Sequence, residues 1–190
     1  KKGALLVFFA FLVYYLATAM ALPYGAGPDY DAHFDGAHFI YAEGRLAVLP
    51  EDASKLHFTA YGSTRALRPP LSYLVAAAAA KTLSWTGIDL QILFRAGSAL
   101  LCALTLSLIF AALNRYLNNR WLALGGVLLV GLLPQFAFIA SHLNDDSAAI
   151  FSVTFLIYCL IRLLREPVDP TIALLTGTAI GFVLLSKFTA

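Results

Sequence analysis

The chain has 190 residues, of which 60% are hydrophobic and 13% charged, and its formal net charge is +2. Soluble domains carry about 25% charged residues, so this composition excludes a water-soluble globule, and it equally excludes intrinsic disorder. The composition is that of an integral membrane protein. Because the net charge is small and no basic run occurs, we expect no nucleic acid partner.

Apolar stretches that approach the roughly 20 residues needed to cross a bilayer core are the main feature of the sequence. They predict an all-α, polytopic transmembrane helical fold with about five spans, at 4–22, 92–113, 121–140, 147–163 and 171–186. We expect residues 1–190 to form a single transmembrane domain in a cell membrane, with a bacterial inner membrane as the location. Since the chain begins with Lys1 and ends directly after an apolar run, we expect a longer gene product.

A helix is also predicted at 69–83, where two prolines mark the first positions. Only about ten apolar residues separate Leu71 from Lys81, too few to cross a bilayer, so this helix should be interfacial. The charges agree with this interpretation. If 69–83 does not cross, the basic segments at the N-terminus, at 114–120 and at 162–165 all face the cytoplasm, as the positive-inside rule expects.

This topology places a long loop, 23–91, on the external face of the membrane. Apolar residues within it recur with helical spacing and stop at Gly44, which predicts a second interfacial helix at 31–44. The start of this helix is rich in carboxylates and imidazoles: Asp29, Asp31, His33, Asp35 and His38. A carboxylate there could cap the helix or take a proton from a substrate, and both alternatives stay open for Asp29 and Asp31.

A second acidic segment, Asn144-Asp145-Asp146, lies between two predicted spans on the same external face. Asn144 or Asp145 could cap the following helix, or one of the carboxylates could face Asp29 across a cleft. The cofactor is left unknown. His33, His38 and His142 could hold a divalent cation, but we expect hydrogen-bonded surface histidines instead and assign no metal ligand.

Taken in order, these segments resemble the GT-C superfamily of polytopic membrane glycosyltransferases, and most of all its protein O-mannosyltransferase and aminoarabinose-transferase branch. The similar segments are Pro28-Asp29-Tyr30-Asp31-Ala32-His33-Phe34, Arg68-Pro69-Pro70-Leu71-Ser72-Tyr73, Leu93-Phe94-Arg95-Ala96-Gly97-Ser98 and Asn144-Asp145-Asp146. The family often has an Asp-Glu pair after the first span. Here the order is Asp29-Tyr30-Asp31, which leaves the choice between the two aspartates open. Family members also have more spans.

The resemblance implies transfer of a sugar from a polyprenyl-phosphate-linked donor at the external membrane face. Asp29, or Asp31 in its place, would be the catalytic base on the acceptor hydroxyl, while cations would stabilise the phosphate leaving group. The substrate-binding residues expected from it are Arg68, Arg95, Lys81, Tyr73, Asp145 and Asp146, with Arg65 as a further candidate for the phosphate. The expected partners are the lipid bilayer and the lipid-linked sugar.

A second function stays open beside this one. The chain could be a non-catalytic membrane subunit of a larger complex, built on a truncated glycosyltransferase-like fold and bound to other membrane subunits. A transporter or channel is disfavoured, because such proteins carry charged residues inside their spans and the middles of these spans contain none.

Overall fold

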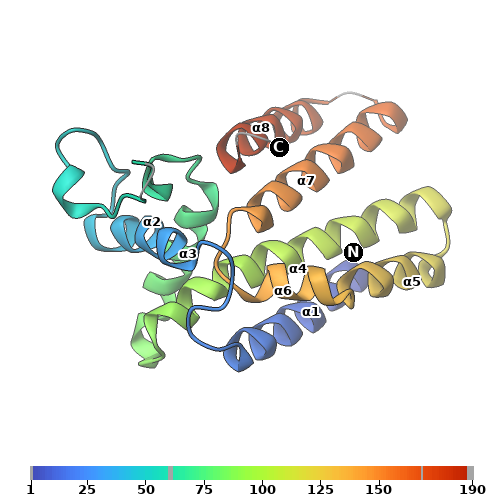
Figure 1. Ribbon diagram of the computed structural model, residues 1–190. Coiled ribbons are helices and arrows are strands. Elements are labelled where there is room, and N and C mark those ends of the chain that lie inside the picture. The colour runs from blue at the N-terminus through green and yellow to red at the C-terminus, as the bar shows by residue number, and fades with distance from the viewer. Residues whose placement is uncertain (1, 60–61, 168, 188–190) are drawn as a thin grey trace.

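The computed structural model describes residues 2–59, 62–167 and 169–187. Lys1, which enters the charge argument above, lies outside the described residues. The prediction of an all-α membrane fold is confirmed (Figure 1). The helices are α1 (Lys2–Ala21), α2 (Tyr30–Glu43), α3 (Leu71–Leu83), α4 (Leu90–Leu117), α5 (Arg120–Gly131), α6 (Pro134–Ser141), α7 (Asp146–Arg165) and α8 (Pro170–Ser186). Short 3-10 helices are η1 (Ala53–Lys55), η2 (Arg65–Leu67) and η3 (Ser84–Thr86).

Among the described helices, α1, α4 and α7 are each long and apolar enough to cross a membrane. The pair α5 and α6 meets the same requirement together, but it is bent by 69°. Helix α8 is apolar and has 17 residues. These elements match the five predicted apolar stretches, and the chain is therefore a helical membrane protein.

The predicted span 121–140 consists of two helices rather than one, and the cause of the break is local. A residue that precedes a proline avoids the helical region, and Leu133, before Pro134, is accordingly extended with φ −58° and ψ 126°. Pro134 then occupies the first turn of α6, where its missing N–H group leaves no helical hydrogen bond unmade. The bend follows from this one dipeptide.

Helix α4 is the central element, and α1, α3, α5, α6 and α7 all pack against it. Small residues let its neighbours approach closely. A Cβ atom added to Gly97 of α4 would lie 2.7 Å from the Cα atom of Ala76 on α3, so only glycine allows this contact. On the α1 side, Tyr15 is fully buried and donates a hydrogen bond to the carbonyl of Gly131 at 2.9 Å.

The two ends of the helical bundle differ in their polar residues. At one end, Arg115 and Arg162 both pair with Glu166, and Arg165 lies over the ring of Tyr116. At the other end, α2 and α3 gather beside the first half of α4, together with the loops that join them (Figure 1). Both acidic segments of the sequence therefore lie at the same end of the bundle, the end that carries α2.

Candidate functional site

Asp29 stands immediately before α2 with a left-handed backbone, at φ 53° and ψ 28°. This conformation is uncommon for a residue other than glycine, and such residues cluster at functional sites. The side chain makes no capping hydrogen bond to the helix. Instead, its Oδ2 atom accepts a hydrogen bond from Nη2 of Arg65 at 2.5 Å. The capping interpretation is therefore wrong for the Asp29 side chain.

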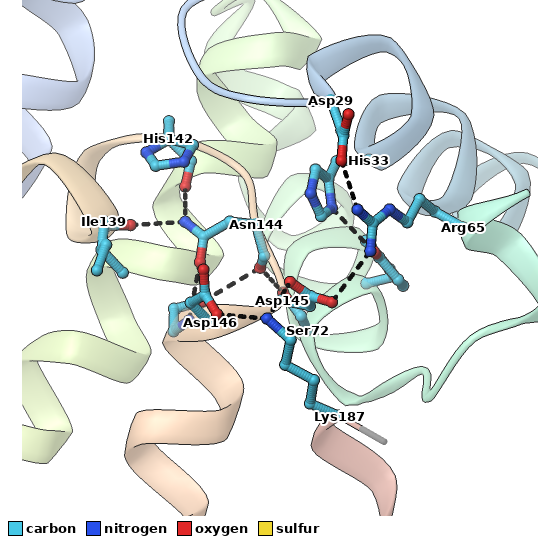
Figure 2. A network of polar contacts seen from close by, with 12 residues as sticks. Asp29, His33, Arg65, Ser72, Ile139, His142, Asn144, Asp145, Asp146 and Lys187 are labelled. Carbon is cyan, nitrogen blue, oxygen red and sulfur yellow. Dashed lines mark hydrogen bonds and ion pairs between the residues drawn. The ribbon is translucent and has the colours of Figure 1, made fainter. Parts of the chain in front are cut away.

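Arg65, on η2, links the start of α2 to the loop that precedes α7 (Figure 2). Its Nη1 atom lies 3.5 Å from Oδ2 of Asp145, while Nη2 contacts Asp29. The Arg65 side chain is 17% exposed, so little water competes for these contacts. The hydrogen bond and the positive charge of Arg65 hold the pKa of the Asp29 carboxyl below its ordinary value. One guanidinium thus brings together the two acidic segments.

Asp145 occupies the N-cap position of α7 without a capping hydrogen bond, and the side chain of Asn144, the other residue expected for that role, bonds the first turn instead. The Oδ1 atom of Asn144 accepts the backbone N–H of Ser147 at 2.8 Å, and its Nδ2 atom donates to the carbonyls of Ile139 and His142, both at 2.7 Å. The hydroxyl of Ser72 on α3 donates to the Asn144 carbonyl. Because Asn144 satisfies the helix, the carboxylates after it are free for other contacts.

Asp145 and Asp146 use that freedom to bind cations from distant parts of the chain (Figure 2). The ammonium group of Lys187, just after α8, lies 2.6 Å from Oδ1 of Asp146 and 3.5 Å from Oδ1 of Asp145. Asp145 therefore lies between Lys187 and Arg65. This network ties the ends of α7 and α8 to η2.

A buried pair lies beneath this network. His33 of α2 and Tyr73 of α3 share a hydrogen bond of 2.9 Å between Nδ1 and Oη. Both side chains are buried. Burial lowers the pKa of His33 to about 4, because the charged imidazolium would be poorly solvated there, so His33 is neutral at pH 7. Tyr73, which we expected to bind substrate, is buried between the two helices, and its predicted role stays a prediction.

A pocket of about 900 Å³ opens along the exposed face of α2. Its lining combines three carboxylates, two imidazoles and three aromatic rings: Asp29, Asp31, Asp35, His38, His57, Tyr30, Phe34 and Phe58, with Gly25, Gly27, Ala32 and Thr59. The rings of Tyr30 and Phe34 are 5.9 Å apart, and those of Phe34 and His38 are 5.7 Å apart and nearly parallel. The rings of Tyr30, Phe34 and His38 thus follow one another along α2, beside the carboxylates of the same helix.

One pair in this pocket was missed by the sequence analysis. Asp35 accepts two hydrogen bonds from His57, one from the ring Nδ1 at 2.9 Å and one from the backbone N–H at 3.2 Å. The Asp35 carboxylate raises the pKa of His57 because it bonds and attracts the imidazolium. The spacing of Asp31 and Asp35, one helical turn apart, could have placed Asp35 in the pocket, whereas nothing in the sequence around His57 marks it.

Some of the expected site residues line the pocket or are linked to it by an ion pair, and the others lie away from it. Asp29 and Asp31 line the pocket, and Asp145 joins them through Arg65. Arg68 is exposed directly after η2. Lys81, in the last turn of α3, is exposed near Gly44 and does not line the pocket. The roles predicted for all of these residues stay predictions.

Arg95 has partners of a different kind from the phosphate we expected. Its Nη1 atom donates to the carbonyls of Ala19 and Leu22 at 2.7 and 2.8 Å, and its Nη2 atom donates to that of Pro23 at 2.6 Å. These carbonyls belong to the end of α1 and the residues that follow, where helical partners are lacking. The Arg95 side chain is buried. In this structure Arg95 therefore supplies hydrogen-bond donors to the carbonyls at the end of α1.

The histidines considered as cation ligands lie apart in their contacts. His33 bonds Tyr73, His38 stacks on Phe34, and the Nδ1 atom of His142 lies 2.6 Å from the carbonyl oxygen of Phe138. Among the residues that the structure describes, no three His, Cys, Asp or Glu side chains form a group that could hold a metal ion.

Comparison with known proteins supplies the family. The family described as dolichyl-phosphate-mannose-protein mannosyltransferase matches residues 67–190. The match includes Arg68, Arg95 and the acidic segment before α7, and it begins after the residues that line the pocket. No curated protein and no solved structure matches the chain. Because the match extends over more than half of its length, the chain belongs to the dolichyl-phosphate-mannose-protein mannosyltransferase family, of GT-C type.

Proposed function

We propose that this membrane protein is a glycosyltransferase that moves a sugar from a polyprenyl-phosphate-linked donor to a hydroxyl acceptor. Its family supports the glycosyltransferase domain. The observation that carries the proposal is the pocket beside α2, where Asp29 and Asp31 stand next to the rings of Tyr30 and Phe34. The reaction would take place at the external face of the membrane.

The pocket has the size and chemistry that a sugar requires. Small-molecule sites are typically about 300–1,000 Å³, lined by apolar and aromatic groups with a few polar groups that orient the ligand. Ionised carboxylates only accept hydrogen bonds, and a sugar offers several hydroxyl donors. The flat rings of Tyr30, Phe34 and His38 would support the apolar C–H face of the same sugar.

In the proposed reaction the oxygen of the acceptor hydroxyl attacks the anomeric carbon of the sugar. A bond forms between them, the bond from that carbon to the phosphate oxygen breaks, and the lipid phosphate leaves with the electron pair. Asp29 takes the proton of the hydroxyl, with Asp31 as its substitute, and a general base of this kind contributes about 10²–10⁴-fold in rate. The ion pair with Arg65 keeps Asp29 ionised, and transfer of Arg65 to the donor phosphate would free the carboxylate to accept the proton.

The cations nearest to these carboxylates are candidates for the donor phosphate. Arg65 contacts Asp29 directly, and Arg68 follows it by three residues and is exposed. Arg65 would exchange one carboxylate for the phosphate when the donor binds. We assign Asp145 and Asp146 to the positioning of Arg65 and Lys187. Arg95 and Tyr73, which are buried and hydrogen-bonded within the protein, we assign to the fold.

We further propose a multi-pass arrangement in which α2, α3 and the pocket face the outside of a bacterial inner membrane. The support is the distribution of arginines. Four arginines lie at the bundle end opposite the pocket: Arg115 in the last turn of α4, Arg120 at the start of α5, and Arg162 and Arg165 in the last turn of α7. Short basic loops of this kind stay in the cytoplasm.

Sugar release from a defined donor tests the proposal. The protein as its gene encodes it would be reconstituted into proteoliposomes with mannosyl polyprenyl phosphate that carries a labelled sugar, and with a membrane-protein extract as acceptor. We expect the label to move from the lipid to the acceptor, and no transfer from a nucleotide-linked sugar. Absence of transfer from lipid-linked sugars, together with stoichiometric co-purification of other membrane subunits, would favour the non-catalytic alternative.

A further inference from the structure

We propose that His57, held by Asp35, is the hydrogen-bond donor that binds the leaving phosphate inside the pocket beside α2. The inference rests on the proposed function, from which it takes the phosphate-linked donor. It assigns to the site a residue outside both the matched part of the chain and the expected site residues. If it holds, the pocket contains a base and a phosphate-binding imidazolium together.

The geometry fixes how the His57 ring is presented. Asp35 accepts hydrogen bonds from the backbone N–H and the ring Nδ1 of His57 at 3.2 and 2.9 Å, and these two bonds orient the segment and the ring. The Nδ1 proton is directed at the carboxylate, which leaves Nε2 on the opposite side of the ring. The His57 side chain is 90% exposed while Asp35 is 10% exposed. Nε2 is therefore the atom available to a ligand.

The charges around His57 favour its protonated form. Asp35 contacts it from α2, and Asp31, Asp29 and His38 line the same pocket from that helix. On the segment that carries His57, the neighbouring cation Lys55 is already paired with Glu43 at 2.9 Å. Asp35 raises the pKa of His57 above its ordinary value. An imidazolium donates from both nitrogens, and its bond to a phosphate oxygen is charge-assisted.

Inside the pocket a phosphate needs such a group, because Arg65 and Arg68, the candidates named above, lie on or directly after η2 and do not line the pocket. Its described lining includes three carboxylates and neither lysine nor arginine. Arg95 donates to the carbonyls at the end of α1, and Lys81 lies near Gly44. His38 stacks flat against Phe34. This leaves His57 as the pocket-lining cation with a donor atom directed away from its own partner.

His57 and Asp29 have opposite environments, which suits two opposite roles in one reaction. Arg65 lowers the pKa of Asp29, and Asp35 raises that of His57. Paired groups separated in this way commonly act as base and acid. As the bond from the anomeric carbon to phosphate breaks, the oxygen gains the electron pair and its charge is met by the Nε2 proton of His57. The acceptor proton goes to Asp29.

Binding of a polyprenyl phosphate that lacks the sugar tests the inference. The full chain would be placed in phosphatidylcholine nanodiscs, and the affinity measured between pH 5.5 and 8.5 for wild type, His57→Gln and His57→Lys. We expect His57→Gln to bind roughly tenfold or more weakly near pH 6, the loss of one charge-assisted hydrogen bond. The ratio of the two affinities should shrink as the pH rises, whereas His57→Lys should keep its affinity to higher pH.

Two further variants make the result specific. Asp35→Asn should lower the pKa of His57, read from its ring ¹³C chemical shift, and move the loss of affinity to lower pH. Lys55→Gln, which removes one paired charge from the same segment, should bind like wild type. If wild type binds and His57→Gln binds equally well, the inference alone is overturned. If wild type does not bind the lipid phosphate at any pH, both the inference and the proposed function are overturned.

Discussion

The carboxylate of Asp29 and the guanidinium of Arg65, separated by 36 residues in the chain, lie 2.5 Å apart. The contact explains why Asp29 does not cap α2 although it occupies the capping position. It also places the proposed base beside the cation that would meet the donor phosphate. Exchange of Arg65 from Asp29 to the phosphate would link donor binding to the release of the base.

Replacement of Arg65 tests how far this contact supports the fold. Arg65→Gln removes the cation shared by Asp29 and the buried Asp145, and we expect a loss of about 1–3 kcal/mol in stability. Thermal unfolding in detergent measures it. Lys55→Gln breaks a surface pair with Glu43 and should cost about 0–1 kcal/mol. Equal effects of the two changes would show that the Arg65 bridge is no stronger than a surface ion pair.

The stability of the protein should fall in mild acid because of His33. Its pKa lies near 4 in the folded protein, against an ordinary value of 6.5, so the unfolded chain binds more protons between these values. This contribution is complete above pH 6.5 and is lost progressively as the pH falls toward 4, by an amount on the order of 1–3 kcal/mol. Unfolding midpoints at pH 7, 5.5 and 4.5 measure it.

His33→Gln should flatten this pH dependence, since glutamine does not titrate. His38→Gln, at an exposed position on the same helix, should leave the slope as it is in wild type. A slope that persists unchanged in His33→Gln would assign the acid sensitivity to another group.

Arg95 is expected to hold the end of α1 in place rather than bind substrate. Arg95→Lys keeps the charge, but one ammonium cannot repeat the donation from two guanidinium nitrogens to Ala19, Leu22 and Pro23. Each buried carbonyl left without a donor costs about 1–3 kcal/mol, so the unfolding temperature should drop clearly. Arg120→Lys, exposed beside Trp121, is the matched control. If the Arg95→Lys protein is as stable as wild type but no longer binds the lipid-linked sugar, Arg95 binds substrate instead.

Cysteine labelling in intact cells tests the membrane arrangement. The 28-residue helix α4 is about 42 Å long and separates the pocket end from the loop that follows Leu117. A cysteine at Glu51, exposed near η1, should react with a membrane-impermeant reagent, whereas one at the exposed Leu117 should react only after the cells are opened. The native cysteines, Cys102 and Cys159, are buried and provide a low background. Labelling of Leu117→Cys from outside would reverse the orientation.

Hydrophobic pattern alone predicted most of the fold, because apolar runs of span length have few alternatives to a helix in lipid. The predicted ends of the spans differ from the observed helix ends where a helix continues through polar residues. Helix α4 runs from Leu90 to Leu117, beyond the predicted 92–113, because the polar residues Gln91, Asn114 and Arg115 continue the helix. The break at Leu133-Pro134 could have been predicted from the proline, since it disfavours helix at the preceding residue.

The site was predicted less completely, and the reason is tertiary contact. Asp29 and Asp145 carried a local signal as acidic residues at helix starts, but their common partner Arg65 is known only once η2 is placed against α2. The pair of Asp35 and His57 depends on how the segment around η1 returns over α2. Gly27 shows the same dependence: a Cβ atom there would lie 2.6 Å from the ring of His142.

The central claim, that the pocket beside α2 transfers sugar with Asp29 as its base, is tested most directly by the transfer rate of Asp29→Asn. Asparagine keeps the size, tolerates the left-handed backbone and can still accept a hydrogen bond from Arg65, so the protein should fold and insert normally. We predict a loss of about 10²–10⁴-fold in sugar transfer from the lipid-linked donor, while Glu51→Gln, exposed on the same loop, keeps the wild-type rate. Transfer by folded Asp29→Asn at the rate of Glu51→Gln would contradict the account.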